Sequence, residues 1–259
     1  MEIIVAHLTY NLGDLEACSL TCRAWYTVAA PHLHHTLTLW GNGPDSTRYN
    51  LGPLYELHKL GLAPLVKEIR VEQMFGLGRW FLPHAFSHSD LRCFSVFSNV
   101  HTLKLQNLEI CHFIPDIERH FGHLSPTLRS ITLLNPNCTP RQLSHFLSSF
   151  PNLDDIEIER DETSVLDYMI TTHTELAPLS GPKLRGRLVV HGFRWVETWT
   201  HLITLCGGLR FHHVDLLGCA GCVPALLEAC AETIETLRFN AMDGSVGEQS
   251  CMGLSMDSS

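Results

Sequence analysis

Cysteine and histidine side chains near the start of the sequence are the first candidates for chemistry. Cys18 and Cys22 lie four positions apart, and His32, His34 and His35 follow them closely. Thiolate and imidazole groups at such spacings are common zinc ligands. A metal site is therefore one interpretation, although His34 and His35 would point to opposite faces if both lie in one strand.

Packing is the interpretation that we favour for these two cysteines. At positions i and i+4 of a helix, Cys18 and Cys22 share a face with Leu15 and Trp25. A small apolar side chain such as cysteine packs well in that environment. The sequence therefore predicts no metal and no cofactor in this stretch.

A second pair of cysteines, Cys219 and Cys222, forms the one CxxC pattern in the sequence. Redox sites use this pattern between a strand and a helix, because the helix N-terminus lowers the thiol pKa. Residues 214–216 are strand-like and Pro224 opens a helical segment, so the order fits. Cys219 also fits a position of the apolar repeat at which a small side chain packs. We favour this packing role for Cys219 over the alternative, a redox enzyme.

Acidic residues gather between positions 154 and 162, where several alternate with Ile156 and Ile158. That alternation predicts a strand with one solvated face, and recognition of a basic partner is the alternative. The sequence contains no GxSxG, HExxH, P-loop or GxGxxG pattern. We therefore expect a non-catalytic protein rather than an enzyme.

The overall composition limits the classes of partner. The chain has 259 residues, of which 45% are apolar and 17% charged, as in a globular protein. Its formal net charge of −9 argues against nucleic acid, which attracts clustered cations. The sequence has neither a long apolar run nor a signal peptide, so we expect no membrane partner, reduced cysteines and a cytoplasmic or nuclear location.

A spaced apolar pattern recurs from residue 66 onward and organises most of the chain. Each copy follows the order apolar-x-x-apolar-x-apolar, and the copy at Leu188 and Val190 is weaker because Arg185 takes the first place. The middle apolar residues are separated by 34, 28, 25, 32, 26 and 23 positions, which suits a strand plus a helix in each unit. These middle residues are Ile69, Leu103, Ile131, Ile156, Leu188, Val214 and Leu237.

The segments between the copies carry helical signals. Residues 139–150 begin with Thr, Pro and Gln at capping positions and continue with apolar residues at i, i+3, i+4 and i+7. Residues 195–203 and 224–232 have similar spacing. Stacked strand–helix units predict a mixed α/β fold, namely a curved solenoid with parallel strands on its concave side.

The first forty residues differ from the repeats. Asp14 is a possible helix cap, Pro31 interrupts the helical pattern, and residues 41–46 are typical of a loop. We expect three helices and a strand, over residues 2–8, 14–20, 22–30 and 34–40. The predicted domains are a helical module at 1–40, a linker and first cap at 41–65, a solenoid at 66–240 and a flexible tail at 241–259.

The N-terminal residues also carry a motif. It comprises residues 2–8, Asp14-Leu15 and the run CSLTCRAW from Cys18 to Trp25. Together these residues resemble the F-box, and more narrowly the F-box of fungal proteins in which leucine-rich repeats follow. The resemblance implies a three-helix module that binds the Skp-type adaptor, and through it a cullin, in an SCF-type (Skp–cullin–F-box) ubiquitin ligase. It also implies that the leucine-rich-repeat-like region binds an unknown protein substrate.

By motif position, the resemblance assigns the adaptor contacts to six residues. Exposed Ile, Leu and Trp side chains on short helices are suited to a groove on a partner. The family usually places Leu-Pro-x-Glu before the first helix, whereas this sequence opens at Met1 within that helix. A protein-binding repeat scaffold with a truncated, non-functional F-box is therefore the alternative function. The six residues are Ile4, Leu8, Leu15, Cys22, Arg23 and Trp25.

Overall fold

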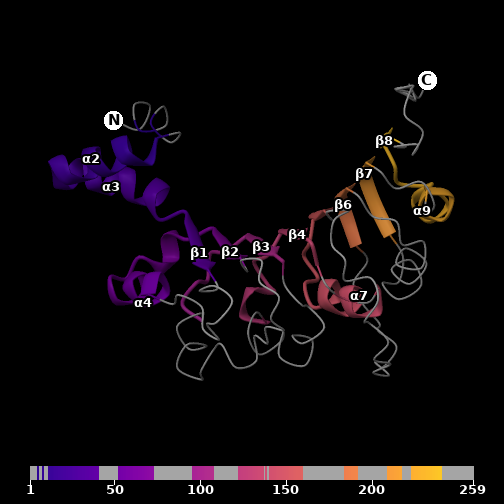
Figure 1. Ribbon diagram of the computed structural model, residues 1–259, viewed down its shortest axis with the longest axis horizontal. Helices are drawn as coiled ribbons and strands as arrows, with labels where there is room; N and C mark the ends of the chain where they lie inside the picture. The colour runs from indigo at the N-terminus through magenta and orange to yellow at the C-terminus, as the bar shows by residue number, and fades with distance from the viewer. Residues whose placement is uncertain are drawn as a thin grey trace.

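The computed structural model of this chain is a row of parallel strands with helices at one end and along one side (Figure 1). Some predicted features lie outside the residues that it describes: Ile4, the loop at 41–46, the helix at 195–203, the Cys219 and Cys222 pair and the tail at 241–259. The described residues are Val5, Leu8, 11–40, 52–72, 95–107, 122–136, Cys138, 140–159, 184–191, 209–217 and 223–240.

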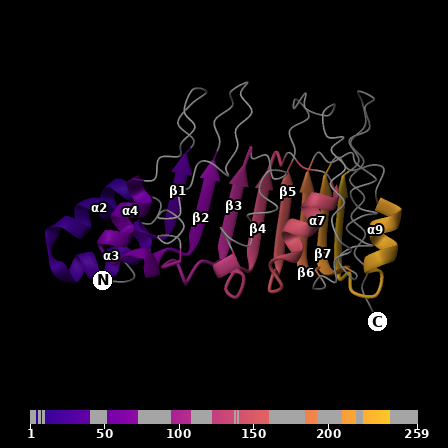
Figure 2. The same cartoon turned by 90° about the horizontal axis from the view of Figure 1, so that it is seen from below.

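Eight strands form one open parallel sheet, in which each strand is hydrogen-bonded to the next one along the chain. Figure 2 shows the arrows side by side and pointing the same way. Parallel neighbours in sequence order require a return connection after every strand, so the mixed α/β class with parallel strands is confirmed. The strands are β1 (Thr36–Trp40), β2 (Glu68–Glu72), β3 (Thr102–Gln106), β4 (Ser130–Leu134), β5 (Asp155–Glu159), β6 (Leu184–His191), β7 (Leu209–Leu217) and β8 (Thr236–Asn240).

The strand register confirms the predicted positions of the apolar repeat. Although the steps along the chain differ in length, the middle apolar residues stand opposite one another across the sheet. Leu37 of β1 joins the same row, so the sheet begins within the segment predicted as the N-terminal helical module. A shift of one position would turn this row away from the core. From β1 to β8 the row is Leu37, Ile69, Leu103, Ile131, Ile156, Leu188, Val214 and Leu237.

The described helices lie beside β1 or along one side of the sheet (Figures 1 and 2). Two of them, α7 and α9, confirm the helices predicted at 139–150 and 224–232. The predicted linker at 41–65 contains a helix and a 3-10 turn rather than loop alone. The described helices and 3-10 turns are α2 (Leu12–Thr21), α3 (Arg23–Leu33), α4 (Gly52–Lys59), η1 (Ala63–Leu65), η4 (Gly122–Leu124), α7 (Pro140–Ser148) and α9 (Val223–Cys230).

The main core lies between the sheet and these helices. Residues Leu143, Phe146 and Leu147 of α7, with Phe150 just after it, have the predicted i, i+3, i+4, i+7 spacing, and each is at most 1% exposed. The rings of Phe146 and Phe150 meet edge to face with centroids 5.3 Å apart. Burial of each such side chain contributes about 1.5–3 kcal/mol. This packing leaves the alternate residues of every strand on the opposite face.

Asparagine residues end two central strands. Asn107 and Asn135 follow β3 and β4 with φ of 57° and 51°, a left-handed conformation that asparagine tolerates better than most residues. The backbone N–H of Asn107 donates to the Leu134 carbonyl at 2.8 Å, and that of Asn135 donates to the Glu159 carbonyl at 2.7 Å. The side-chain amide of Asn135 also donates to Asn107 Oδ1 at 3.0 Å. Hydrogen bonds therefore connect the turns that follow neighbouring strands, at the C-terminal ends of those strands.

The start of α2 differs from the prediction. The side-chain oxygen of Asn11 accepts hydrogen bonds from the backbone N–H groups of Gly13 and Asp14, at 3.1 and 3.4 Å. Asn11 is therefore the cap, three positions before the predicted one, because a short amide side chain satisfies free N–H groups as well as a carboxylate does. The Asn11 amide in turn donates to Asp14 Oδ2 at 2.7 Å.

The ends of α2 and α3 also differ from the prediction. Cys22 is extended, with φ −164° and ψ 166°, and separates the two helices. Cys18 and Cys22 therefore do not share one helical face, as the i, i+4 spacing had suggested. Helix α3 continues through Pro31 to Leu33, because a proline this close to the C-terminal end disturbs only the last turn.

Candidate functional site

The face of the sheet opposite the core is rich in polar and charged side chains. No described helix lies over this face in Figure 1. We call it the polar sheet face and define it by two rows of residues that the strand register aligns. The first row is Thr36, Glu68, Thr102, Ser130, Asp155, Arg187, His213 and Thr236, and the second is Thr38, Arg70, Lys104, Thr132, Glu157, Val189, Asp215 and Arg238.

Charges near the N-terminal end of this face are compensated. Glu68 is only 9% exposed, and its Oε1 accepts a charge-assisted hydrogen bond from Arg70 Nε and lies 3.5 Å from Lys104 Nζ. On the neighbouring strand, the indole N–H of Trp40 donates to Glu72 Oε2 at 3.1 Å. A buried carboxylate needs such partners, so these residues are already occupied by one another.

Carboxylates dominate the middle of the face at β5. Ser130 donates to Asp155 Oδ2 at 3.4 Å, and Thr132 donates to Glu157 Oε2 at 3.2 Å. The strand has the predicted alternation, with Ile156 and Ile158 buried and the acidic residues between them outside the core. The prediction of a polar strand face is therefore confirmed for residues 155–159, while positions 161 and 162 lie outside the described residues.

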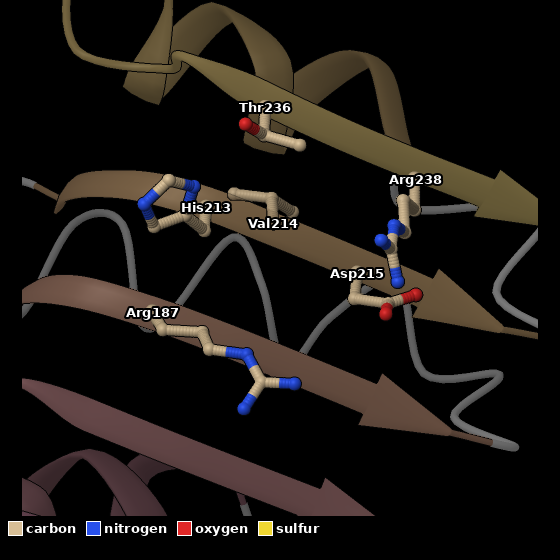
Figure 3. A pocket seen from close by; sticks show the side chains of 6 residues that line it. All are labelled: Arg187, His213, Val214, Asp215, Thr236 and Arg238. Atoms are coloured by element: carbon tan, nitrogen blue, oxygen red, sulfur yellow. The ribbon is translucent and has the colours of Figure 1, made fainter. Parts of the chain in front are cut away.

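A pocket lies at the C-terminal end of the face, over β6, β7 and β8 (Figure 3). Its volume is about 280 Å³. Arg187 rises from β6, His213 and Asp215 from β7, and Arg238 from β8 (Figure 3). In the described part of the chain, neither Arg187 nor Arg238 forms an ion pair. We call this the C-terminal pocket, lined by Arg187, His213, Val214, Asp215, Thr236 and Arg238.

A bulge positions the side chains of this pocket. The register between β6 and β7 shifts after Gly186, which pairs with Phe211, while Arg187 pairs with His213. The backbone at Gly186 has φ of 90°, and a Cβ there would lie 1.7 Å from the Asp154 carbonyl oxygen. Only glycine fits this site, and the extra residue of β7 brings Arg187 and His213 onto the same face. This pocket was not predicted from the sequence, although a glycine within a strand is a signal for a bulge.

The helices α2 and α3, here called the helical pair, form a second candidate surface. They have a small core of their own, which consists of Val5, Leu15 and Ala29. Leu8 and Trp25, both predicted adaptor contacts, are partly buried against it. Among the other predicted contacts, Cys22 and Arg23 are exposed and Ile4 lies outside the described residues.

Leu15 lies in the interior of the helical pair. The resemblance assigned it to a partner-binding surface, but it is 1% exposed and packs within the helical pair. Other side chains take the exposed positions instead. Leu12 is 60% exposed, Leu20 85% and Tyr26 39%. These residues flank the predicted motif, and a spacing pattern alone does not show which leucine of a short helix turns inward.

The cysteines and histidines of the helical pair do not assemble a metal site. Cys18 is partly buried, Cys22 is exposed, and both thiols are free. His34 lies at the C-terminal end of α3, where burial lowers its pKa and so favours the neutral ring. Among the residues that the structure describes, no group of three or more His, Cys, Asp or Glu side chains is arranged to hold a metal ion.

Comparison with known proteins gives no further guide to these surfaces. No protein-family model, no curated protein and no solved structure matches the chain. In the described part of the chain, no helix has both the length and the apolar character needed to cross a membrane. The polar sheet face and the helical pair are therefore the two features on which a functional argument rests.

Proposed function

We propose that this chain is a non-catalytic adaptor that binds one protein through its helical pair and another through its polar sheet face. In this proposal it is an F-box-like protein with a leucine-rich-repeat-like region. The helical pair binds the Skp-type adaptor, and through it a cullin, of an SCF-type ubiquitin ligase in the cytoplasm or nucleus. The observation that carries the proposal is the long polar face of eight parallel strands in register, set beside helices with a separate core.

The dimensions of the sheet support a protein as the partner of the polar face. Parallel strands lie about 4.8 Å apart, so eight of them offer a surface on the order of 30 Å across. Small-molecule sites are instead enclosed, mostly apolar cavities with a few polar groups. A broad face with separate charged regions matches a macromolecular surface better.

The step between strands supports the leucine-rich-repeat-like assignment. The strands recur every 23 to 34 residues and always return to the same register. Each unit has an apolar face that only its neighbours bury, which is how stacked repeats are stabilised. The asparagines after β3 and β4 also link one unit to the next through their side chains.

The helical pair supports a docking role because it leaves apolar side chains in solvent. Leu20 and Tyr26 flank the junction at Cys22, and Arg23 is exposed between them. Tyrosine and arginine are two of the residue types enriched in binding hot spots. The exposed side chains of Leu20 and Tyr26 could be buried in an apolar groove of a partner protein.

Binding of the full chain to a recombinant Skp-type adaptor tests this role. We expect the wild-type chain to co-elute with the adaptor in size-exclusion chromatography. The double variant Leu20→Ala, Tyr26→Ala should bind about tenfold more weakly or worse, because it removes exposed contacts without touching the core. Leu60→Ala is the matched control, since Leu60 is 66% exposed but follows α4 rather than lying in the helical pair.

Two results would overturn the docking role. One is a wild-type chain that does not bind the adaptor at all, and the other is equal weakening by the double variant and by Leu60→Ala. Either result would favour the alternative, in which the chain is a repeat scaffold that binds a partner through the polar sheet face alone. The scaffold and the ligase adaptor differ only in this interaction, so the same experiment distinguishes them.

A further inference from the structure

Charge is distributed unevenly along the polar sheet face. At its N-terminal end, Glu68 is compensated by Arg70 and Lys104. At the C-terminal pocket, the guanidinium groups of Arg187 and Arg238 are exposed, and within the described residues they make no hydrogen bond or ion pair. The cations at the N-terminal end have an internal partner, whereas those of the pocket are available to a ligand.

The register places these two arginines on either side of one strand. Arg187 pairs with His213 in the first row, and Arg238 pairs with Asp215 in the second. Strands β6 and β8 are thus about 10 Å apart with β7 between them, a distance that two arginine side chains can span toward a shared ligand. Figure 3 shows both side chains on the same face of the sheet, with the Asp215 carboxylate between their guanidinium groups in this view and with His213 and Thr236 further back along their strands.

We propose that the C-terminal pocket binds an acidic segment of a protein partner, with Arg187 and Arg238 as the groups that hold its carboxylates. The inference rests on the proposed role of the polar sheet face as a partner-binding surface and adds the chemical class of the bound segment. Arginine is suited to this task, because its planar group donates two parallel hydrogen bonds to a carboxylate. His213 and Thr236 add further donors beside them.

Neighbouring charges define where the acidic segment lies. The carboxylates of Asp155, Glu157 and Glu159 on β5 repel an anion, and Asp155 stands directly opposite Arg187, so an anion is favoured on the side of Arg187 that faces β7 and β8. Asp215 lies in the pocket beside Arg238 (Figure 3), and two arginines against one aspartate leave the pocket positive. The chain as a whole has a formal charge of −9, so binding of an anion requires this local site rather than a general attraction.

A titration of the full chain with an oligoglutamate peptide tests the inference. Side-chain Nε–H resonances of the arginines report binding by nuclear magnetic resonance. We expect the signals of Arg187 and Arg238 to shift, and the shifts to diminish as salt is raised. An oligoglutamine peptide of equal length should cause no shift. Arg187→Gln and Arg238→Gln should each weaken binding about tenfold, through loss of a charge-assisted hydrogen bond.

Arg210→Gln is the matched control, because Arg210 is exposed on β7 but does not line the pocket. Equal weakening by this variant, or unchanged affinity in the Arg187 and Arg238 variants, would overturn the inference. A parallel titration with inorganic phosphate separates a protein segment from a free anion. Shifts with phosphate and none with oligoglutamate would also overturn the inference as stated.

Binding of an acidic segment by the C-terminal pocket and binding of the Skp-type adaptor by the helical pair can be tested separately. The Arg187→Gln, Arg238→Gln double variant should bind the Skp-type adaptor as the wild type does, because the pocket and the helical pair lie at opposite ends of the sheet (Figure 1). Loss of adaptor binding in this variant would mean that it is misfolded. Its unfolding midpoint in urea should match that of the wild type, since both arginines are exposed.

Discussion

Two leucines of α2 illustrate how single positions decide the surface of the helical pair. Leu15 is 1% exposed and Leu20 is 85% exposed, and a separation of five residues places them roughly 140° apart around the helix. The difference arises because α3 covers only one face of α2, the face that carries Leu15. Substitution of Leu15 would therefore test folding, whereas substitution of Leu20 tests binding.

Thiol reactivity should follow burial at the residue scale. Cys22 is exposed at the junction of α2 and α3, whereas Cys230 is 1% exposed and burial raises the pKa of its thiol. Because the thiolate is the reactive form, we expect iodoacetamide to modify Cys22 in the folded protein and Cys230 only after denaturant is added. Peptide mapping by mass spectrometry measures both. Equal modification of the two in the folded protein would contradict the assigned burial.

We expect His34 to make the free energy of unfolding vary with pH. Its pKa in the folded chain lies below the ordinary value of 6.5 because the ring is partly buried. As the pH falls below about 6.5, the unfolded chain therefore takes up a proton first, and the free energy of unfolding decreases. Above that pH the ring is neutral in both states, and its contribution to stability is fully present.

Urea unfolding at about pH 7.5 and about pH 5.5 measures this effect. We expect His34→Gln to lose less stability than the wild type between the two pH values, since glutamine does not titrate. His35→Gln is the control, because His35 is exposed next to it. An identical loss in the wild type and in His34→Gln would show that the imidazole of His34 does not contribute.

At the scale of elements, the bulge between β6 and β7 links stability to the C-terminal pocket. Gly186→Ala should lower the free energy of unfolding by about 2 kcal/mol or more, because alanine strains the backbone at φ 90° and its Cβ collides with the Asp154 carbonyl. Urea unfolding measures the loss. Gly122→Ala is the matched control, since no atom lies within 4 Å of the added Cβ and its φ is not in the left-handed region.

A Gly186→Ala variant as stable as Gly122→Ala would mean that the register of β6 is wrong. A further consequence concerns the pocket itself. Because the register shift after Gly186 places His213 beside Arg187, the variant should also weaken oligoglutamate binding. Urea unfolding and oligoglutamate binding, measured on the same variant, together test whether the backbone conformation at Gly186 positions the side chains of the C-terminal pocket.

The elements that the sequence predicted well are those defined by apolar spacing. Ile69, Leu103, Ile131 and Ile156 were predicted as equivalent strand positions, and the register aligns them. This succeeds because a buried strand position must be apolar in every unit. Helix α7 was predicted for the same reason, since its capping and apolar residues agree.

The candidate site was much less predictable. The C-terminal pocket combines Arg187, His213 and Arg238, which come from three strands and become neighbours only through pairing and a bulge. Charged residues on a strand face carry no periodic signal that distinguishes a free arginine from a paired one such as Arg185, whose Nε lies 3.0 Å from Asp154 Oδ1. Such differences follow from tertiary contacts.

At the scale of the whole molecule, the two candidate surfaces are spatially separate. The helical pair adjoins β1, and the C-terminal pocket lies at β6 to β8, so the row of strands stands between them (Figure 1). An adaptor needs such an arrangement, because two partners that bind at once must not collide. In the proposed function, the charged regions of the polar sheet face determine which segment of a substrate the pocket accepts.

Amide hydrogen exchange of the full chain, with and without a saturating recombinant Skp-type adaptor, tests the central claim most directly. The proposal predicts slower exchange in α2 and α3 when the adaptor is present, because a bound partner suppresses their local opening. Amides of β3, β4 and β5 should exchange at the same rate in both samples, since they lie away from the helical pair. Unchanged exchange in α2 and α3 would contradict the proposal that these helices bind the adaptor.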